Sequence, residues 1–251
     1  MTAEPMGRLI PEDDPIAAEL VLAVHGGDVD AVRRLLAEDP SLASARILAR
    51  RGGTSTPLLV VTDWPGYFRN GPEIVRLLIE AGADPNARTT DRAGEPGETP
   101  LHYAASSDDV DVAAALIDGG ADINAPDGSI GTPLANAVGY ACWHVARLMV
   151  ARGAEVSQPW EAAALGMLGR LDELLGDQPA ADKVSQAFWH ACAGGQRRAA
   201  EYLLTRGADL HWVPDYAQGT PLDTAKGLGT RQENVITWLQ EQGARSSKPD
   251  E

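Results

Sequence analysis

Residues 97–125, GETPLHYAASSDDVDVAAALIDGGADINA, contain the signals of two short helices joined by a turn. Thr99 is a natural helix N-cap, and Pro100 fits the first helical turn, where its missing N–H costs nothing. Apolar residues then recur at helical spacing across 110–117, and the glycine pair at 119–120 ends this second helix. The stretch therefore predicts a helix–turn–helix unit that is followed by an extended turn.

Two phrases of this stretch recur along the chain at a nearly constant spacing. Relatives of TPL occur as STPLL at 55–59, GTPLA at 131–135 and GTPLD at 219–223. Relatives of GAD follow them, for example 20 residues after Pro100 and 20 residues after Pro133. These two prolines are 33 residues apart, and a fixed period of this length indicates stacked repeats that bury their apolar faces against one another.

The quoted stretch resembles an ankyrin repeat throughout, and related repeats cover nearly the whole chain. The resemblance implies an all-α solenoid of about seven helix–turn–helix repeats, some of them divergent, in a single domain over residues 14–246. We expect short hairpin-like turns and no extended sheet. The expected repeats are 14–44, 54–88, 89–125, 126–158, 159–181, 182–213 and 214–246.

Several segments fall outside this pattern. Residues 1–13 form an N-terminal segment, SARILARRGG at 44–53 is interpreted as a linker, and residues 247–251 are expected to be a flexible tail. The segment TDWPGYFRN at 62–70 is an insertion between the two helices of the second repeat. We therefore expect this insertion to project from an otherwise regular stack.

The segment AFWHACAGG at 187–195 places aromatic, histidine and cysteine side chains close together. Aligned on the repeat period, Trp189 matches His102, and Cys192 matches a small core alanine. We expect Cys192 to pack as a small apolar side chain. For His102, the resemblance implies a hydrogen bond to Thr99 that braces the turn, which is a structural role.

A zinc site built from Cys142, His144, His190 and Cys192 is the alternative interpretation of the two cysteines. Residues two apart on a helix point to different sides, so neither pair can chelate from one helix. The two pairs also lie two repeats apart, about 16–20 Å if neighbouring helices pack at 8–10 Å, whereas zinc ligands lie at about 2.0–2.3 Å. We therefore expect no metal, no cofactor and two free thiols.

The composition excludes several classes of partner. The 251 residues include 36 acidic and 21 basic ones, and the net charge of −15 repels nucleic-acid phosphates and anionic lipids. The longest apolar run, PLLVV at 57–61, is far shorter than the roughly 18 residues that a membrane helix needs. The start of the sequence lacks the basic and apolar stretches of a secretory signal. We expect a monomeric cytoplasmic protein that binds neither nucleic acid nor membrane.

Stacked helix pairs with projecting turns create a concave surface, and aromatic side chains on it are candidate anchors for another protein. The candidate partner-binding residues are Trp64, Tyr67, Phe68, Trp160, Trp189, His211, Trp212 and Tyr216. The alternative is that some of these side chains only seal gaps between imperfect repeats.

Searches for the GxSxG, HExxH, P-loop and GxGxxG motifs find no match, and no residue is assigned a catalytic role. The favoured hypothesis is a non-catalytic scaffold that binds another protein, which the acidic surface predicts to be basic. A second hypothesis is a small-molecule-binding protein or enzyme with a pocket near Trp189, His190, His211, Trp212 and Tyr216. A third is an inhibitor or antitoxin-like protein that masks a basic partner.

Overall fold

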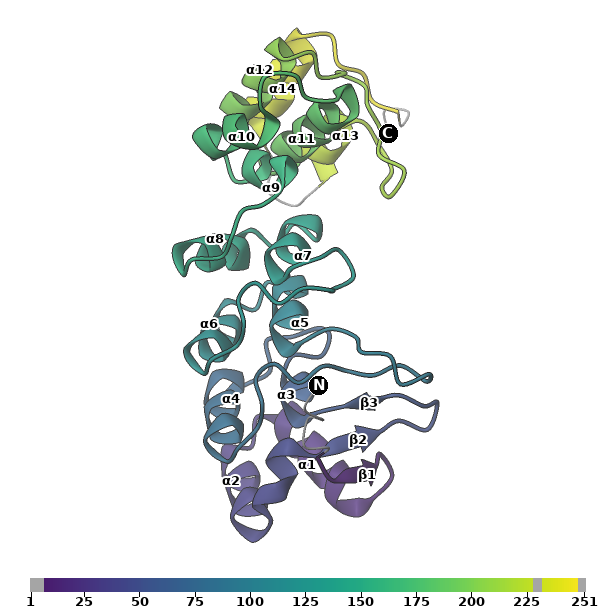
Figure 1. Cartoon of the computed structure of the whole chain (residues 1–251), viewed down its shortest axis with the longest axis vertical. Coiled ribbons are helices and arrows are strands. Elements are labelled where there is room, and N and C mark those ends of the chain that lie inside the picture. Colours follow the sequence, from purple (N-terminus) through teal and green to yellow (C-terminus); the bar gives the residue numbers. More distant parts are fainter. Residues whose placement is uncertain (1–6, 228–231, 248–251) are drawn as a thin grey trace. The chain divides into compact units, whose positions relative to one another are not determined.

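A computed structural model of the chain describes residues 7–227 and 232–247 (Figure 1). These residues are predominantly helical, which confirms the all-α class, and one pair of helices falls in each of the seven predicted repeats. The outer parts of the predicted N-terminal segment and tail, residues 1–6 and 248–251, lie outside the described residues. Residues 228–231 of the seventh repeat lie outside them as well.

The first helices of the pairs are α1 (Pro15–Gly26), α3 (Pro57–Val61), α5 (Pro100–Ser106), α7 (Pro133–Gly139), α9 (Pro159–Ala164), α11 (Ala181–Ala193) and α13 (Pro221–Gly227). The second helices are α2 (Val29–Glu38), α4 (Gly71–Glu80), α6 (Val110–Asp118), α8 (Trp143–Ala151), α10 (Leu168–Leu175), α12 (Arg197–Thr205) and α14 (Glu233–Glu241). Each of the first helices except α11 begins with a proline, whose fixed φ suits the first helical position.

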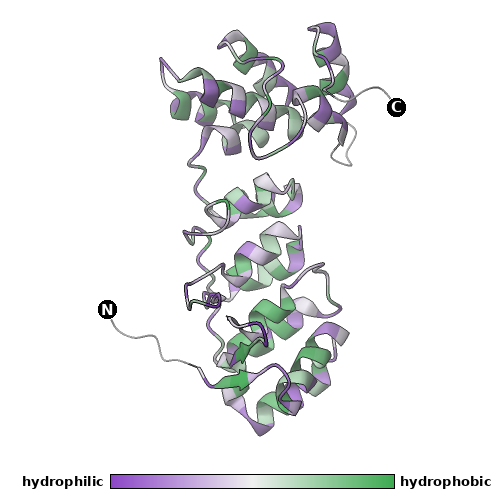
Figure 2. Cartoon of the chain, turned by 90° about the vertical axis from the view of Figure 1, so that its right-hand side faces the viewer, coloured by the Kyte–Doolittle hydropathy of each residue, from purple (hydrophilic) through white to green (hydrophobic). Residues whose placement is uncertain are grey.

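The contacts divide the chain into two compact blocks. We call the residues through Ala154 the N-terminal block and those from Glu155 the C-terminal block. In the N-terminal block α1, α3, α5 and α7 pack in one row, and α2, α4, α6 and α8 pack in a second row against it. In the C-terminal block α9, α11 and α13 form a row, and α10, α12 and α14 each pack on the first helix of their own pair. The helices carry hydrophobic residues on some faces and hydrophilic residues on others, as such stacking requires (Figure 2).

In five of the seven repeats the core includes the large apolar residue at the position of Leu101, whereas Ile16 and Trp160, which follow the first prolines of α1 and α9, are only half-buried. Leu58, Leu101 and Leu134 are at most 1% exposed in the N-terminal block. In the C-terminal block the same position is occupied by Phe188 and Leu222, which are 0% and 3% exposed. The repeat alignment therefore predicts the buried position of Phe188 correctly.

A small three-stranded sheet includes Arg46–Leu48 of the segment 44–53, which the sequence predicts to be a linker. β1 (Leu9–Pro11) pairs in parallel with β2 (Arg46–Leu48), and β2 pairs antiparallel with β3 (Thr54–Ser55). The turn between β2 and β3 contains the glycine pair at 52–53, whose φ angles of 83° and 85° cost glycine no strain. The linker interpretation was wrong because strands of two or three residues show too little alternation to be recognised.

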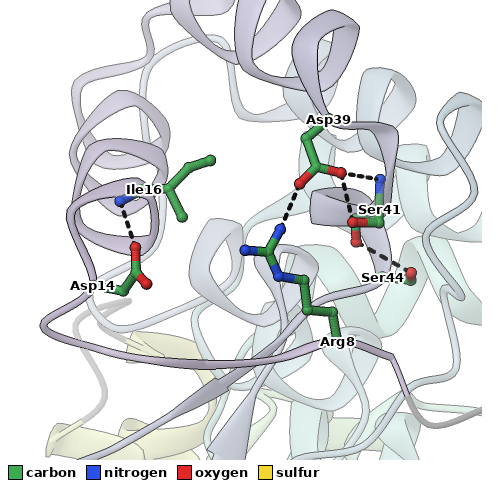
Figure 3. A network of polar contacts seen from close by, with 6 residues as sticks. All are labelled: Arg8, Asp14, Ile16, Asp39, Ser41 and Ser44. Atoms are coloured by element: carbon green, nitrogen blue, oxygen red, sulfur yellow. Dashed lines mark hydrogen bonds and ion pairs between the residues drawn. The ribbon is translucent and has the colours of Figure 1, made fainter.

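The polar contacts drawn in Figure 3 fasten the N-terminal strand. Arg8 donates a hydrogen bond to one carboxylate oxygen of Asp39 at 2.6 Å. The other oxygen accepts from the Ser41 backbone N–H at 3.0 Å and from the Ser41 hydroxyl at 2.6 Å. The Ser41 hydroxyl is the main cause of the lowered pKa of Asp39, to which Arg8 also contributes. β1 is thus tied to the segment before β2 by an ion pair as well as by strand pairing.

Candidate protein-binding groove

The TPLH phrase joins neighbouring repeats through His102, which is fully buried. Its Nδ1 accepts a hydrogen bond from the backbone N–H of Thr99 at 3.3 Å and lies 2.8 Å from the Thr99 hydroxyl. Its Nε2 donates to the carbonyl oxygen of Gly131 at 3.1 Å, in the turn before α7. Burial lowers the pKa of His102, which keeps the ring neutral at pH 7. The bracing bond to Thr99 is therefore confirmed.

Trp189 makes the equivalent contact in the C-terminal block. Its indole N–H donates to the carbonyl oxygen of Gly219 at 3.1 Å, in the turn before α13. The side chain is only 9% exposed. Trp189 therefore joins one repeat to the next in the way that His102 does, as its position in the repeat alignment suggests.

The first helices of the first three repeats and two neighbouring turns border an open cavity of about 270 Å³ in the N-terminal block. Eight residues line it, and we call them the groove: Val21 and His25 of α1, Ser55 of β3, Leu59 and Val60 of α3, Asp63, Thr89, and Tyr103 of α5. Repeat proteins of stacked helix pairs use surfaces formed by successive repeats to bind partners.

The insertion at 62–70 lies between α3 and α4, where the sequence predicts it, and borders the groove at Asp63. One carboxylate oxygen of Asp63, Oδ1, accepts a hydrogen bond from the backbone N–H of Trp64 at 2.8 Å. The Trp64 side chain is 82% exposed, more than any other large apolar side chain in the described residues. Because this area has no packing role in the fold, Trp64 is a candidate contact for a partner.

Tyr67 and Phe68, the other aromatic residues of the insertion, are anchored to neighbouring repeats. The backbone N–H of Tyr67 donates to Oδ2 of Asp109 at 2.7 Å, and its hydroxyl donates to the carbonyl oxygen of Asp108. Phe68 stacks on His25, with 4.6 Å between the ring centroids. Phe68 thus supports a residue that lines the groove, whereas Tyr67 remains 63% exposed.

Asp63 gives the groove a negative charge. With histidine neutral, it is the only formally charged residue among the eight that line the cavity. Burial raises the pKa of the Tyr103 hydroxyl, and the negative charges of Glu98 and Asp63 raise it further. The field of the Asp63 carboxylate therefore acts on α5, on another side of the cavity.

In the C-terminal block the structure brings together Trp160, Trp189, His190 and Tyr216. The ring centroid of His190 lies 4.9 Å from that of Trp160, 5.0 Å from that of Trp189 and 6.2 Å from that of Tyr216. Its Nε2 lies 3.1 Å from the Tyr216 hydroxyl oxygen. Burial lowers the pKa of His190 to about 4, so the ring is neutral at pH 7. These rings pack on one another, and His190 fills the space among the other three.

His211 and Trp212 lie on the turn that follows α12. The backbone N–H of His211 donates to the Asp209 carboxylate at 2.8 Å, and that of Trp212 donates to the Asp209 carbonyl oxygen at 3.2 Å. The His211 side chain is exposed and that of Trp212 is half-buried. The sequence predicts a pocket near Trp189, His190, His211, Trp212 and Tyr216. Ring contacts join three of these five residues, namely Trp189, His190 and Tyr216.

Most residues of the groove carry no signal in the sequence. Val60, Asp63 and Tyr103 belong to different helices or loops, and no local motif marks them. The only available signal was for Asp63, which directly precedes Trp64 at the start of a segment already identified as an insertion.

The two cysteines, Cys142 and Cys192, are free and buried. Burial raises the pKa of the Cys142 thiol to about 11, and it also raises that of the Cys192 thiol. Both thiols are therefore protonated at pH 7 and are poor metal ligands or nucleophiles. Across residues 7–227 and 232–247, no three His, Cys, Asp or Glu side chains gather as a metal site requires.

Replacing Cys192 by serine should destabilise the C-terminal block by about 2 kcal/mol, because a hydroxyl would enter a fully buried site. Urea unfolding followed by circular dichroism measures the loss. Cys192→Ala is the matched control, since it removes the sulfur without adding a polar group, and it should cost less. Equal stability of the serine variant and the wild type would contradict a packing role.

Two comparisons with known proteins agree with this architecture. A family model described as ankyrin repeats (3 copies) matches residues 66–159. Among solved structures, the chain is similar to the ankyrin repeat domain of Bcl-3, described as a unique member of the IkappaB protein family. The identity is 26%, the match covers 88% of this chain and 97% of that chain, and the TM-score is 0.50. None of the described helices combines the length and apolar character needed to cross a bilayer. With its repeated TPL phrases and the seven helix pairs of its described residues, the chain has the ankyrin repeat fold.

Proposed function

We propose that this chain is a non-catalytic scaffold that binds another protein through the groove of its N-terminal block. Ankyrin repeats mediate protein–protein interaction in general, and the groove supplies a location for it. The observation that carries the proposal is the cavity of about 270 Å³ that Asp63 helps to line, together with the side chain of the next residue, Trp64, which is 82% exposed. Tryptophan is enriched among the residues that dominate binding energy at protein interfaces.

The alternative of a small-molecule site or enzyme centre in the C-terminal block has weaker support. The ring of His190 is in contact with three aromatic side chains that occupy the space a ligand would need. Its pKa of about 4 also makes it a poor general base at pH 7. The burial of Trp189 and its bond to Gly219 favour a packing role for this cluster.

The proposed setting is the cytoplasm, with the chain as a monomer. The free, protonated thiols of Cys142 and Cys192 suit a reducing compartment. A net charge of −15 favours a basic partner and disfavours self-association. An inhibitory role, in which the chain masks a basic protein, is one form that such binding can take.

Replacing Trp64 by alanine should weaken binding of the partner at least tenfold and leave the free energy of unfolding within about 0.5 kcal/mol, since the side chain is exposed. Tagged wild-type and variant chains are used to capture proteins from a lysate of the source organism, and the affinity of each captured protein is then titrated.

The matched control is Tyr140→Ala, which removes another exposed aromatic side chain of the N-terminal block, one that does not line the groove. Val60→Arg provides a second test, because it fills the cavity and introduces a charge. A partner that binds Trp64→Ala and Val60→Arg as tightly as Tyr140→Ala and wild type would refute the proposal.

A further inference from the structure

The cavity of the groove has the size of one large side chain. Its volume of about 270 Å³ is below the roughly 300–1,000 Å³ of pockets that hold a small-molecule ligand. Its wall includes the aliphatic side chains of Val21, Leu59 and Val60. The occupant that fits is therefore a single side chain of a bound segment, and the part of it inside the cavity is apolar.

The mouth of the cavity favours a positive charge on that side chain. Asp63 carries the only formal charge among the lining residues, and no ion pair to it is found in the described parts of the chain. Its Oδ1 is oriented by the backbone N–H of Trp64, and its charge contributes to the raised pKa of Tyr103. One carboxylate oxygen of Asp63 therefore has a hydrogen-bond partner, and the exposed carboxylate acts on the cavity without a neutralising cation.

Competing occupants fit this environment less well. An acidic side chain would be repelled by Asp63. A purely apolar side chain would cover the carboxylate and remove part of its hydration without offering a hydrogen bond in return. A lysine or arginine places its aliphatic stem on the apolar wall and keeps its charged head at the carboxylate. The indole of Trp64, next in sequence to Asp63, is 82% exposed, so its ring is available for contact with a cation.

We propose that the groove binds a segment of a partner protein by one lysine or arginine, whose stem fills the cavity and whose cationic head pairs with Asp63. This inference rests on the proposed function and specifies the chemistry of the partner. It also gives the net charge of −15 a local role, because the acidic chain attracts a basic protein and Asp63 selects one residue of it.

The test uses the purified full chain and a positional-scanning library of nonapeptides. The wild type should prefer lysine or arginine at one position at least tenfold over norleucine or glutamate. Asp63→Asn retains an oxygen that can accept from the Trp64 N–H but removes the charge, so it should abolish this preference. Asp63→Lys should reverse it and select aspartate or glutamate. Urea unfolding of each variant checks that the fold is intact.

The matched control is Glu80→Gln, which removes one exposed negative charge from α4, away from the residues that line the groove. It should retain the preference for a basic residue. If Asp63→Asn and Glu80→Gln weaken that preference equally, the attraction comes from the net charge and the Asp63 contact is refuted. A second outcome is that peptides bind the wild type, lose binding to Val60→Arg and show no preference for a basic residue. This outcome would refute the present inference but would still support the proposed function. A library without any binder sensitive to Val60→Arg would refute both.

Discussion

Replacing Phe188 by alanine should destabilise the C-terminal block by about 3–5 kcal/mol. The side chain is 0% exposed and packs edge-to-face on Trp238, with 6.4 Å between the ring centroids. Removing the ring leaves a cavity between α11 and its neighbours that the surrounding helices can only partly fill. Stacked repeats stabilise one another, so the loss should extend to the repeats in contact with α11.

Urea unfolding followed by circular dichroism and tryptophan fluorescence measures this change. Val213→Ala is the matched control, because it also shortens an apolar side chain of the C-terminal block but at a position that is 45% exposed. The control should lie within about 0.5 kcal/mol of the wild type. A loss below about 1 kcal/mol in Phe188→Ala would contradict the placement of this residue in the core.

Lowering the pH from 7 to 4 should remove about 3 kcal/mol of stability through His190 alone. Burial lowers the pKa of this residue from 6.5 to about 4 in the folded chain. Between these two values the unfolded chain binds a proton that the folded chain does not. The contribution of His190 to the free energy of unfolding is therefore fully present above pH 6.5. It decreases as the pH falls towards 4, by about 1.4 kcal/mol for each unit of pKa difference.

The matched variant is His190→Gln, whose amide can keep a hydrogen bond to Tyr216 but does not titrate. The free energy of unfolding of both chains is measured at several pH values between 4 and 7.5. His102, Glu98 and Asp223 also have lowered pKa values and contribute to acid sensitivity in both chains. The difference between the two pH profiles gives the contribution of His190 to the free energy of unfolding. Parallel profiles would contradict the lowered pKa and would show that this ring is accessible to water.

The helical architecture could be predicted because its signals are local. Thr99 and Pro100 start a helix through contacts within one turn, and their relatives at Thr132 and Thr220 do the same. The sheet could not be predicted in this way. The residue that pairs with Leu9 is Arg46, far along the chain, and each strand is too short to show a period.

The candidate site was predictable only in part. The exposed aromatic residues Trp64 and Tyr67 could be identified because the insertion interrupts a regular repeat. The cavity depends on how α1, α3 and α5 stack, and a single sequence does not show how much space these three helices leave between them. For the same reason His190 and Tyr216 could be expected near each other, while their direct contact and the low pKa of His190 could not.

The hydrogen bond from Trp189 to Gly219 has a consequence for how such chains diverge. At the equivalent position His102 forms the same kind of bond with an imidazole N–H. In the course of divergence one ring N–H donor can therefore replace another. The sequence then no longer matches the TPLH motif, but the hydrogen bond between neighbouring repeats is kept. A search that counts identical residues overlooks such a repeat. One that accepts any ring N–H donor two residues after the position of the helix-initiating proline would retain it.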